Sequence, residues 1–342
     1  MNKFLPYLLL ITLVILSGCS SQSVDLGKSP EAIFNSKNMA MRSSGVVAAD
    51  SLWIIKDGLQ GEAGLYEGEN ALPIKSLSID VNIIEFLASV DLSVSYSQIK
   101  PQNELTFKYP AFHGMLVRDF QVNIGERKFR AVISAKDSAE EIYQLAKKRG
   151  FNAVIVSQEA FGDMIVKTSI KEKSDIDILY SYTQLSSVSG KDRLIALPSF
   201  KGLENSSFNL KLRGSFISPL VSFSGLNKKI KGTKFFENIK DRNVIKNGLQ
   251  LKYQVQNLHG VSSDQKYAIA WNSQLNIYEP KLVDGSESVA KCKEDILKPA
   301  FAFLELRELI NKDKPFNEIQ SHAIESKLLT PITRLLLIDA IK

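Results

Sequence analysis

Six segments of the chain alternate apolar and polar residues with a period of two, and this pattern constrains the fold more than any other feature. They lie at residues 77–83, 90–96, 105–109, 176–182, 208–212 and 249–255. Successive side chains of a β-strand point to opposite faces, so the alternation is typical of strands with one face in a core and the other in water. Many such strands joined by short polar connections predict a mainly β (α+β) fold built on an antiparallel β-sandwich.

One helix is predicted to interrupt these strands. Ser138 and Glu141 have the spacing of a capping box, and Gly150 is a suitable residue to end the helix. Between them an apolar stripe recurs at helical spacing, formed by Ala139, Ile142, Tyr143 and Ala146. Because apolar segments flank this stretch at 129–133 and 153–156, we expect a strand, a helix and a strand in succession, with the stripe packed in the core.

The periodicity changes near the C-terminus. Pro299 and Pro315 suit the first turn of a helix, and the apolar residues behind each of them predict two amphipathic helices. The final apolar run, 332–341, fits a strand or a helix, and its periodicity does not decide between them.

The first 18 residues are predicted to be a secretion signal. Lys3 precedes an apolar run at 4–16 that is shorter than the ~20 residues of a membrane-spanning helix. The run ends in Leu16-Ser17-Gly18-Cys19, which resembles the lipobox of bacterial lipoproteins. This resemblance implies lipidation at Cys19, and Ser20 after it resembles the pattern of outer-membrane lipoproteins. An uncleaved anchor, or a plain signal peptide with a chance cysteine, is the alternative.

Composition excludes several classes of protein. The chain of 342 residues is 44% hydrophobic and 23% charged, as in ordinary globular proteins, and its net charge of +6 gives no argument for nucleic-acid binding. Its two cysteines, Cys19 and Cys292, provide neither a disulfide framework nor a cysteine zinc cage. Cys292 is therefore expected to be a buried or unpaired thiol.

Three stretches share residues with a known domain. They are LPIKS at 72–76, the segment 124–159 with its Ala139-x-x-x-Tyr143-x-x-Ala146 motif, and Leu197-Pro198. Together they resemble the VIT domain, the vault protein inter-alpha-trypsin domain, over residues 72–198. The chain departs from the family at Ala111-Phe112, where Leu-Pro is usual, and at Ala135, where Glu is common. The resemblance implies a β-sandwich with one inserted helix.

Relatives such as the inter-alpha-trypsin inhibitor heavy chains carry a von Willebrand A domain after this module, with Mg²⁺ on an Asp-x-Ser-x-Ser loop. Of two matches here, 91–95 lies inside a predicted strand and is not expected to bind metal. In the other, Asp284, Ser286 and Ser288 offer the hard oxygen ligands that suit Mg²⁺, although a helix-capping turn is the favoured interpretation. Residues 289–342 are too few for an A domain. The segments 301–310 and 328–339 instead resemble those that follow it in relatives, with Arg334 where a small residue is usual. We therefore predict a VIT protein without an A domain.

No catalytic constellation is visible. Gly-x-Ser-x-Gly and Gly-x-Gly-x-x-Gly motifs are missing from the sequence, and His113, His259 and His322 lie far apart. We predict a non-enzymatic, lipid-anchored outer-membrane protein without cofactor, small-molecule substrate or nucleic-acid partner. Its sandwich would bind a protein or matrix partner through sheet edges and loops. A metal-dependent adhesion protein using Asp284, and a periplasmic hydrolase with residues from distant strands, are the alternatives.

The predicted organisation has five parts. They are a lipoprotein signal peptide at 1–18, a tether at 19–49, a VIT-like β-sandwich at 50–200, a β-rich extension at 201–285 and a helical region at 286–342.

Overall fold

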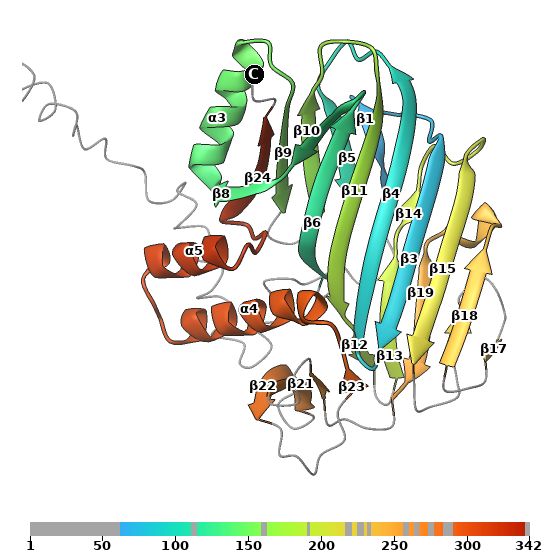
Figure 1. The fold of residues 1–342 in the computed structure, drawn as a ribbon, viewed down its shortest axis with the longest axis vertical. Coiled ribbons are helices and arrows are strands. Elements are labelled where there is room, and N and C mark those ends of the chain that lie inside the picture. Colours follow the sequence, from blue (N-terminus) through green and yellow to red (C-terminus); the bar gives the residue numbers. More distant parts are fainter. Residues whose placement is uncertain are drawn as a thin grey trace, which may run out of the picture.

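The chain folds into a layered, mainly β structure (Figure 1). The computed structural model describes residues 62–110, 115–158, 163–189, 192–215, 221–223, 229–230, 234–255, 260–262, 267–272, 277–282 and 290–338. Cys19 lies outside these residues, as do Asp284, Ser286 and Ser288. In the described part, no helix is both long enough and apolar enough to cross a membrane.

A seven-stranded sheet forms the first layer, in the order β18-β15-β3-β4-β11-β6-β7. Its strands are β3 (Ser76–Ile84), β4 (Leu87–Ile99), β6 (Met115–Ile124), β7 (Arg127–Arg130), β11 (Ser174–Leu185), β15 (Ser207–Ser215) and β18 (Lys234–Ile239). Neighbours are antiparallel except β15 and β3, which run parallel. The residues predicted to alternate in β3 and β4 do so, with Leu77, Ile79, Val90 and Leu92 among those turned into the core.

An eight-stranded sheet forms the second layer, in the order β14-β1-β5-β10-β9-β24-β8, with β2 paired to β1. Its strands are β1 (Glu62–Glu67), β2 (Asn70–Ala71), β5 (Leu105–Tyr109), β8 (Val132–Ala135), β9 (Ala153–Gln158), β10 (Met164–Ser169), β14 (Ser199–Phe200) and β24 (Thr333–Ile338). The final apolar run, which periodicity left open, is therefore a strand at 333–338. It lies between β8 and β9 and pairs antiparallel with both.

Two smaller sheets complete the β-structure described. One is ordered β12-β13-β19-β16-β17 and the other β22-β21-β20-β23. Their strands are β12 (Ser187–Ser189), β13 (Asp192–Leu197), β16 (Val221–Phe223), β17 (Lys229–Ile230), β19 (Leu249–Gln254), β20 (Val261–Ser262), β21 (Tyr267–Asn272), β22 (Ile277–Leu282) and β23 (Ala290–Lys291). A single turn of 3-10 helix, η3 (Arg242–Val244), precedes β19.

The two large sheets share one core with β13 and β19. Tyrosines from both layers meet in it: the hydroxyls of Tyr109 on β5 and Tyr182 on β11 are 2.8 Å apart, and the ring of Tyr180 lies 5.2 Å from that of Tyr109. A buried hydroxyl needs a hydrogen-bond partner, and here each tyrosine provides one for the other layer. The predicted mainly β (α+β) fold built on antiparallel sheets is confirmed.

Helix α3 (Lys136–Lys148) connects β8 to β9 and packs on β9 and β24 with Ala139, Tyr143 and Ala146 buried. Its start differs from the prediction, because the helix begins at Lys136 and the residue before it makes no side-chain cap. Ile142 is exposed rather than part of the buried stripe. Gly150 ends the helix as expected, with a φ of +79° that L side chains rarely adopt.

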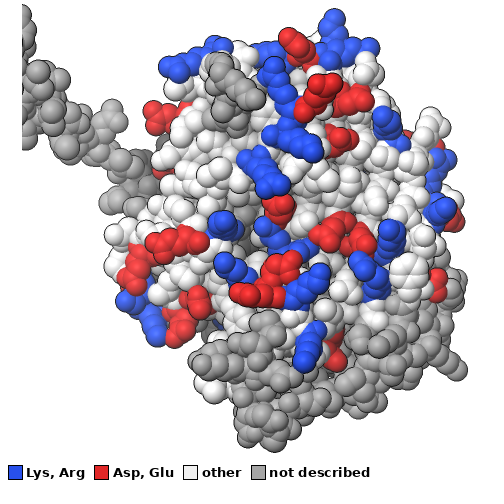
Figure 2. Space-filling view, in the orientation of Figure 1, with Lys and Arg blue, Asp and Glu red and all other residues white. Residues whose placement is uncertain are grey.

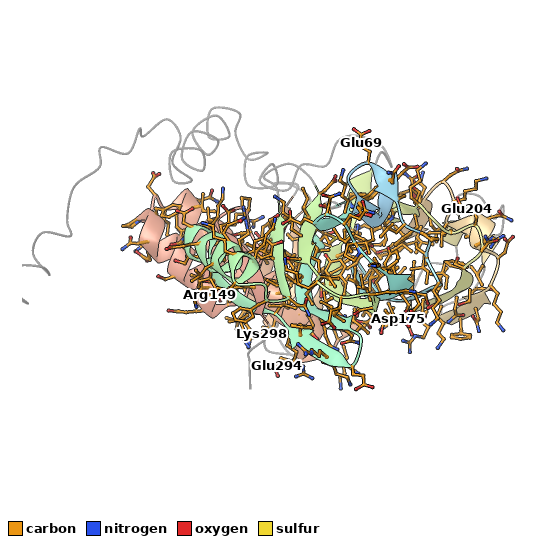
Figure 3. All side chains as sticks on the ribbon, turned by 90° about the horizontal axis from the view of Figure 1, so that it is seen from above. Glu69, Arg149, Asp175, Glu204, Glu294 and Lys298 are labelled. Carbon is orange, nitrogen blue, oxygen red and sulfur yellow. The ribbon has the colours of Figure 1, made fainter. Side chains whose placement is uncertain are left out.

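Helices α4 (Glu294–Asn311) and α5 (Phe316–Glu325) pack at one end of the sandwich (Figure 1). Pro299 lies inside α4 rather than at its start, and Pro315 immediately precedes α5. Both helices belong to a second apolar cluster, which also contains Phe86, Leu87 and Leu185 from the tips of the large strands. Seen from above (Figure 3), Glu69 beside β1 and Glu294 at the start of α4 lie on opposite sides of the layers.

Candidate interaction surface

The outer face of the seven-stranded sheet faces the viewer in Figure 1. Helix α4 crosses its lower end, where the Thr183 hydroxyl donates a hydrogen bond to the Ile296 carbonyl (2.8 Å). Above α4, none of the described helices or sheets covers the face. In the space-filling view (Figure 2), it is a broad area of uncharged residues crossed by scattered acidic and basic side chains.

Short polar side chains make up the centre of this face. Ser78 on β3 lies directly opposite Ser93 on β4, and Ser76 lies opposite Ser95. Asn82 continues the row on β3, and the neighbouring strands continue it with Asn123, Asp177, Ser181, Asn209 and the longer Gln121, all half-buried. Covering a short side chain costs less conformational entropy than immobilising Lys, Arg, Gln or Glu, for which the cost reaches about 1.5–2 kcal/mol each. Most of this surface can therefore be covered at a low entropic cost.

Two aspartates sit opposite each other on the same face, and each has its own arginine. Asp80 on β3 and Asp91 on β4 are cross-strand neighbours, an arrangement that is unfavourable for two like charges. Arg213 of β15 donates to Asp80 through Nη2 (2.7 Å) and Nε (3.2 Å). Arg118 of β6 donates to Asp91 at 2.8 Å. The two arginines therefore neutralise the opposed aspartates.

A β-bulge places Arg118 in this position. Ser181 of β11 pairs with Asp119, but the next residue, Tyr182, pairs with Val117, so Arg118 is an extra residue in β6. A bulge of this kind redirects a side chain. Arg118 also donates to the Ser89 hydroxyl (2.8 Å) and lies 3.6 Å from the Asp295 carboxylate of α4. It thus connects the sheet face to the helix that crosses it.

The other residues singled out in the sequence have structural roles where the structure describes them. The motif at 91–95 lies on β4, inside a strand as predicted, and Asp91 is paired to Arg118. His322 on α5 lies 3.3 Å from the Ala302 carbonyl and 3.7 Å from Glu305; His113 and His259 lie outside the described residues. No group of three or more His, Cys, Asp or Glu residues in the described part could hold a metal ion.

Cys292 is the buried thiol that the sequence predicted. Burial raises its pKa to about 11, so the thiol is protonated at neutral pH and a poor nucleophile.

The succession of paired strands, one helix and a further strand agrees with a comparison against known families. Residues 74–182 match the family model described as Vault protein inter-alpha-trypsin domain, VIT. These residues form a VIT domain. It provides β3, β4 and β6, which carry most of the candidate surface, together with α3 and three quarters of β11.

Comparisons with individual proteins add little to this assignment. No curated protein matches the chain. Among solved structures, the aminopeptidase A of Legionella pneumophila in complex with aspartic acid is similar over 64% of this chain and 25% of that one. The two share 8% sequence identity, with a TM-score of 0.30. The chain spans about a quarter of that structure's length, and a likeness at this level carries no conclusion about fold or activity.

Strands from outside the matched segment complete the VIT domain. β15 extends its first sheet by pairing parallel with β3, and β1 pairs with β5 in its second sheet. β24 fills the position between β8 and β9. Arg334 on β24, where relatives have a small residue, lies 3.5 Å from Glu140 on α3 and donates to the Thr333 carbonyl. At Ala135, the other described departure, the residue before α3 makes no side-chain cap.

Proposed function

We propose that the protein is a non-enzymatic, lipid-anchored component of the cell envelope whose VIT domain binds another protein. The open face of the seven-stranded sheet is the proposed contact surface, in place of the edges and loops expected from the sequence. One observation carries this proposal: the centre of the face consists mostly of short polar side chains, and its opposed aspartates, Asp80 and Asp91, are each paired with an arginine. A partner can therefore cover the centre of the face without immobilising many long side chains, and the Asp80 and Asp91 carboxylates would be buried together with their arginines.

Blocking the face is expected to abolish partner capture. The double substitution Ser78→Arg and Ser93→Arg places two long charged side chains on a directly opposed pair at its centre. In pull-downs from envelope extracts, we expect recovery of the partner to fall at least about tenfold, since a buried unpaired charge costs several kcal/mol. The partner captured by the unmodified protein would first be identified by mass spectrometry.

A matched pair of substitutions controls for added charge. Gln144→Arg and Leu145→Arg add the same two positive charges on the exposed side of α3, which packs on the second sheet. These variants should retain the partner, and all should melt near the wild-type temperature. Equal capture by the Ser78/Ser93 variant would contradict the proposed face, and a hydrolase activity abolished by one point substitution would contradict a non-enzymatic role.

Membrane attachment is expected to depend on Cys19 alone. Each methylene of an acyl chain contributes about 0.8 kcal/mol on burial, so two or more chains give a stable anchor. The Cys19→Ala variant should move from the membrane pellet to the supernatant and lose labelling by radioactive palmitate. Cys292→Ala, the chain's other cysteine, should remain labelled and membrane-bound. An unmodified thiol at the mature N-terminus, seen by mass spectrometry, would rule out the anchor.

A further inference from the structure

The tip of the β3–β4 hairpin carries a buried carboxyl group. Glu85 and Phe86 form the turn, and Glu85 adopts a φ of +53°, which is unusual for a residue other than glycine. Only 6% of Glu85 is exposed. Within the described part of the structure, its Oε2 atom is buried without a hydrogen-bond partner. Hairpin turns ordinarily place polar side chains in water, so both the conformation and the burial of Glu85 are exceptional.

The residues around Glu85 join the sandwich to the C-terminal region. The Ser186 amide donates to the Phe86 carbonyl (2.8 Å), and the Tyr278 hydroxyl of β22 donates to the Ser186 carbonyl (2.7 Å). The rings of Phe86 and Tyr278 are 4.9 Å apart. From α4, Arg307 donates to the Tyr278 carbonyl (2.6 Å). We call the set Glu85, Phe86, Ser186, Tyr253 and Tyr278 the hairpin-tip junction.

The titratable and charged groups that face the junction come from four elements. Tyr253 of β19 interacts electrostatically with Glu85, with Arg193 on β13 and with Tyr278 on β22. Arg307 of α4 donates a hydrogen bond to the backbone carbonyl of Tyr278. Burial is the cause that raises the pKa of Glu85 to about 7, from an ordinary value of 4.5. Since a carboxylate in this site has lost its water and Oε2 has gained no hydrogen bond, ionisation is unfavourable in the closed junction.

We propose that protonation of Glu85 controls the docking of the C-terminal region, β22 and α4, on the VIT sandwich. With the carboxyl neutral, the hairpin tip stays buried against Tyr278 and the junction is closed. With the carboxyl ionised, the tip moves toward water, the Phe86–Tyr278 contact loosens and the apolar cluster that contains Leu87 and Leu185 becomes accessible. The proposal concerns a conformational equilibrium and holds whether or not the outer face binds a partner.

The sign of the effect follows from the two protonation states. The pKa of Glu85 is higher in the closed junction than in water, so the closed state binds the proton more tightly. The stabilisation is complete below a pH of about 4.5 and is lost as the pH rises through about 7. Most carboxylates act in the opposite direction, since pairing lowers their pKa and stabilises the fold at higher pH.

Hydrogen exchange of the full chain tests this directly. Protection factors of β22 and α4, corrected for the intrinsic exchange rate at each pH, should fall at least about tenfold between about pH 5.5 and pH 8. Those of β9 and β10, which lie away from the junction, should change little. In Glu85→Gln, which keeps the shape of the protonated side chain, β22 and α4 should remain protected at both pH values.

Two further variants make the outcome decisive. Glu126→Gln changes an exposed glutamate in another two-residue turn, between β6 and β7, and should retain the wild-type pH dependence. Glu85→Gly removes the carboxyl and suits the positive φ, so it provides the same comparison if Glu85→Gln does not fold. Unchanged protection of β22 and α4 in the wild type across this range would overturn the proposal. A full pH-dependent loss in Glu85→Gln or Glu85→Gly would overturn it as well.

Discussion

Removing residues 333–342 is expected to prevent the VIT sandwich from folding. β24 pairs with β8 on one side and β9 on the other, so its loss leaves two rows of backbone groups without partners inside a sheet. Leu335 and Leu337 are buried in the main core, and Leu336 packs under α3. Truncating one buried leucine costs about 2–5 kcal/mol, so losing three leucines is comparable to a typical domain stability of about 5–15 kcal/mol, and the lost backbone pairing adds to this cost.

Circular dichroism and recovery of soluble protein measure this effect. The truncated chain should show no cooperative thermal transition, and a synthetic peptide of residues 328–342 should restore one when added during refolding. Removal of residues 339–342 alone leaves β24 intact and serves as the control, with a wild-type melting curve expected. If the chain ending at residue 332 melts cooperatively near the wild-type temperature, β24 is dispensable and the prediction is wrong.

Gly202→Ala is expected to destabilise the protein by more than about 3 kcal/mol. A side chain at this backbone conformation costs roughly 1–3 kcal/mol, and steric overlap of the new Cβ adds to that cost. Gly202 has a φ of +83°, and a Cβ there would lie 2.3 Å from the Leu72 carbonyl oxygen. The chain cannot move apart easily at this point, because the Gly202 carbonyl accepts a hydrogen bond from the Ile74 amide (2.7 Å). The close approach holds the start of the VIT domain against the segment that leaves β14.

Gly68→Ala separates the steric effect from the conformational one. Gly68 also has a positive φ, +62°, but no neighbouring atom lies within 4 Å of the position of an added Cβ. Its substitution should therefore cost only the strain of the left-handed backbone, about 1–2 kcal/mol. Equilibrium unfolding in urea measures both losses. Equal losses at the two positions would show that the segment near Leu72 relaxes and that the overlap is unimportant.

The candidate surface was only partly predictable from the sequence. The polar positions of the alternating strands, including Ser78 and Ser93, follow from the period of two alone, because opposite faces of a strand alternate residue by residue. Arg118 was missed, although the run Met115-Leu116-Val117 followed by two charged residues breaks the alternation and is a signal of the bulge. Its partners Ser89, Asp91 and Asp295 lie far away in sequence, and only folding brings them together.

The burial of Glu85 was even less predictable from the sequence than the candidate surface. A glutamate between two alternating strands predicts an exposed turn, and nothing local indicates burial. Tyr278 and Tyr253, which surround it, follow almost 170 residues or more later in the chain. Its environment, and with it the pKa, therefore depends on contacts that no local pattern encodes.

The sequence by itself determined which residues turn inward, that the chain builds a β-sandwich, and that one helix lies between two strands near residue 140. These are local properties, since a period of two or of 3.6 residues can be recognised within a short segment of the sequence. The tertiary structure decided which strands are neighbours: β24 between β8 and β9, and β15 parallel to β3. It also decided that the 332–341 run contains a strand rather than a helix. This run pairs between β8 and β9, two strands that lie nearly 180 residues or more earlier in the chain. Pairing depends on backbone groups meeting across such distances, and a sequence pattern records the faces of a strand but not its neighbours.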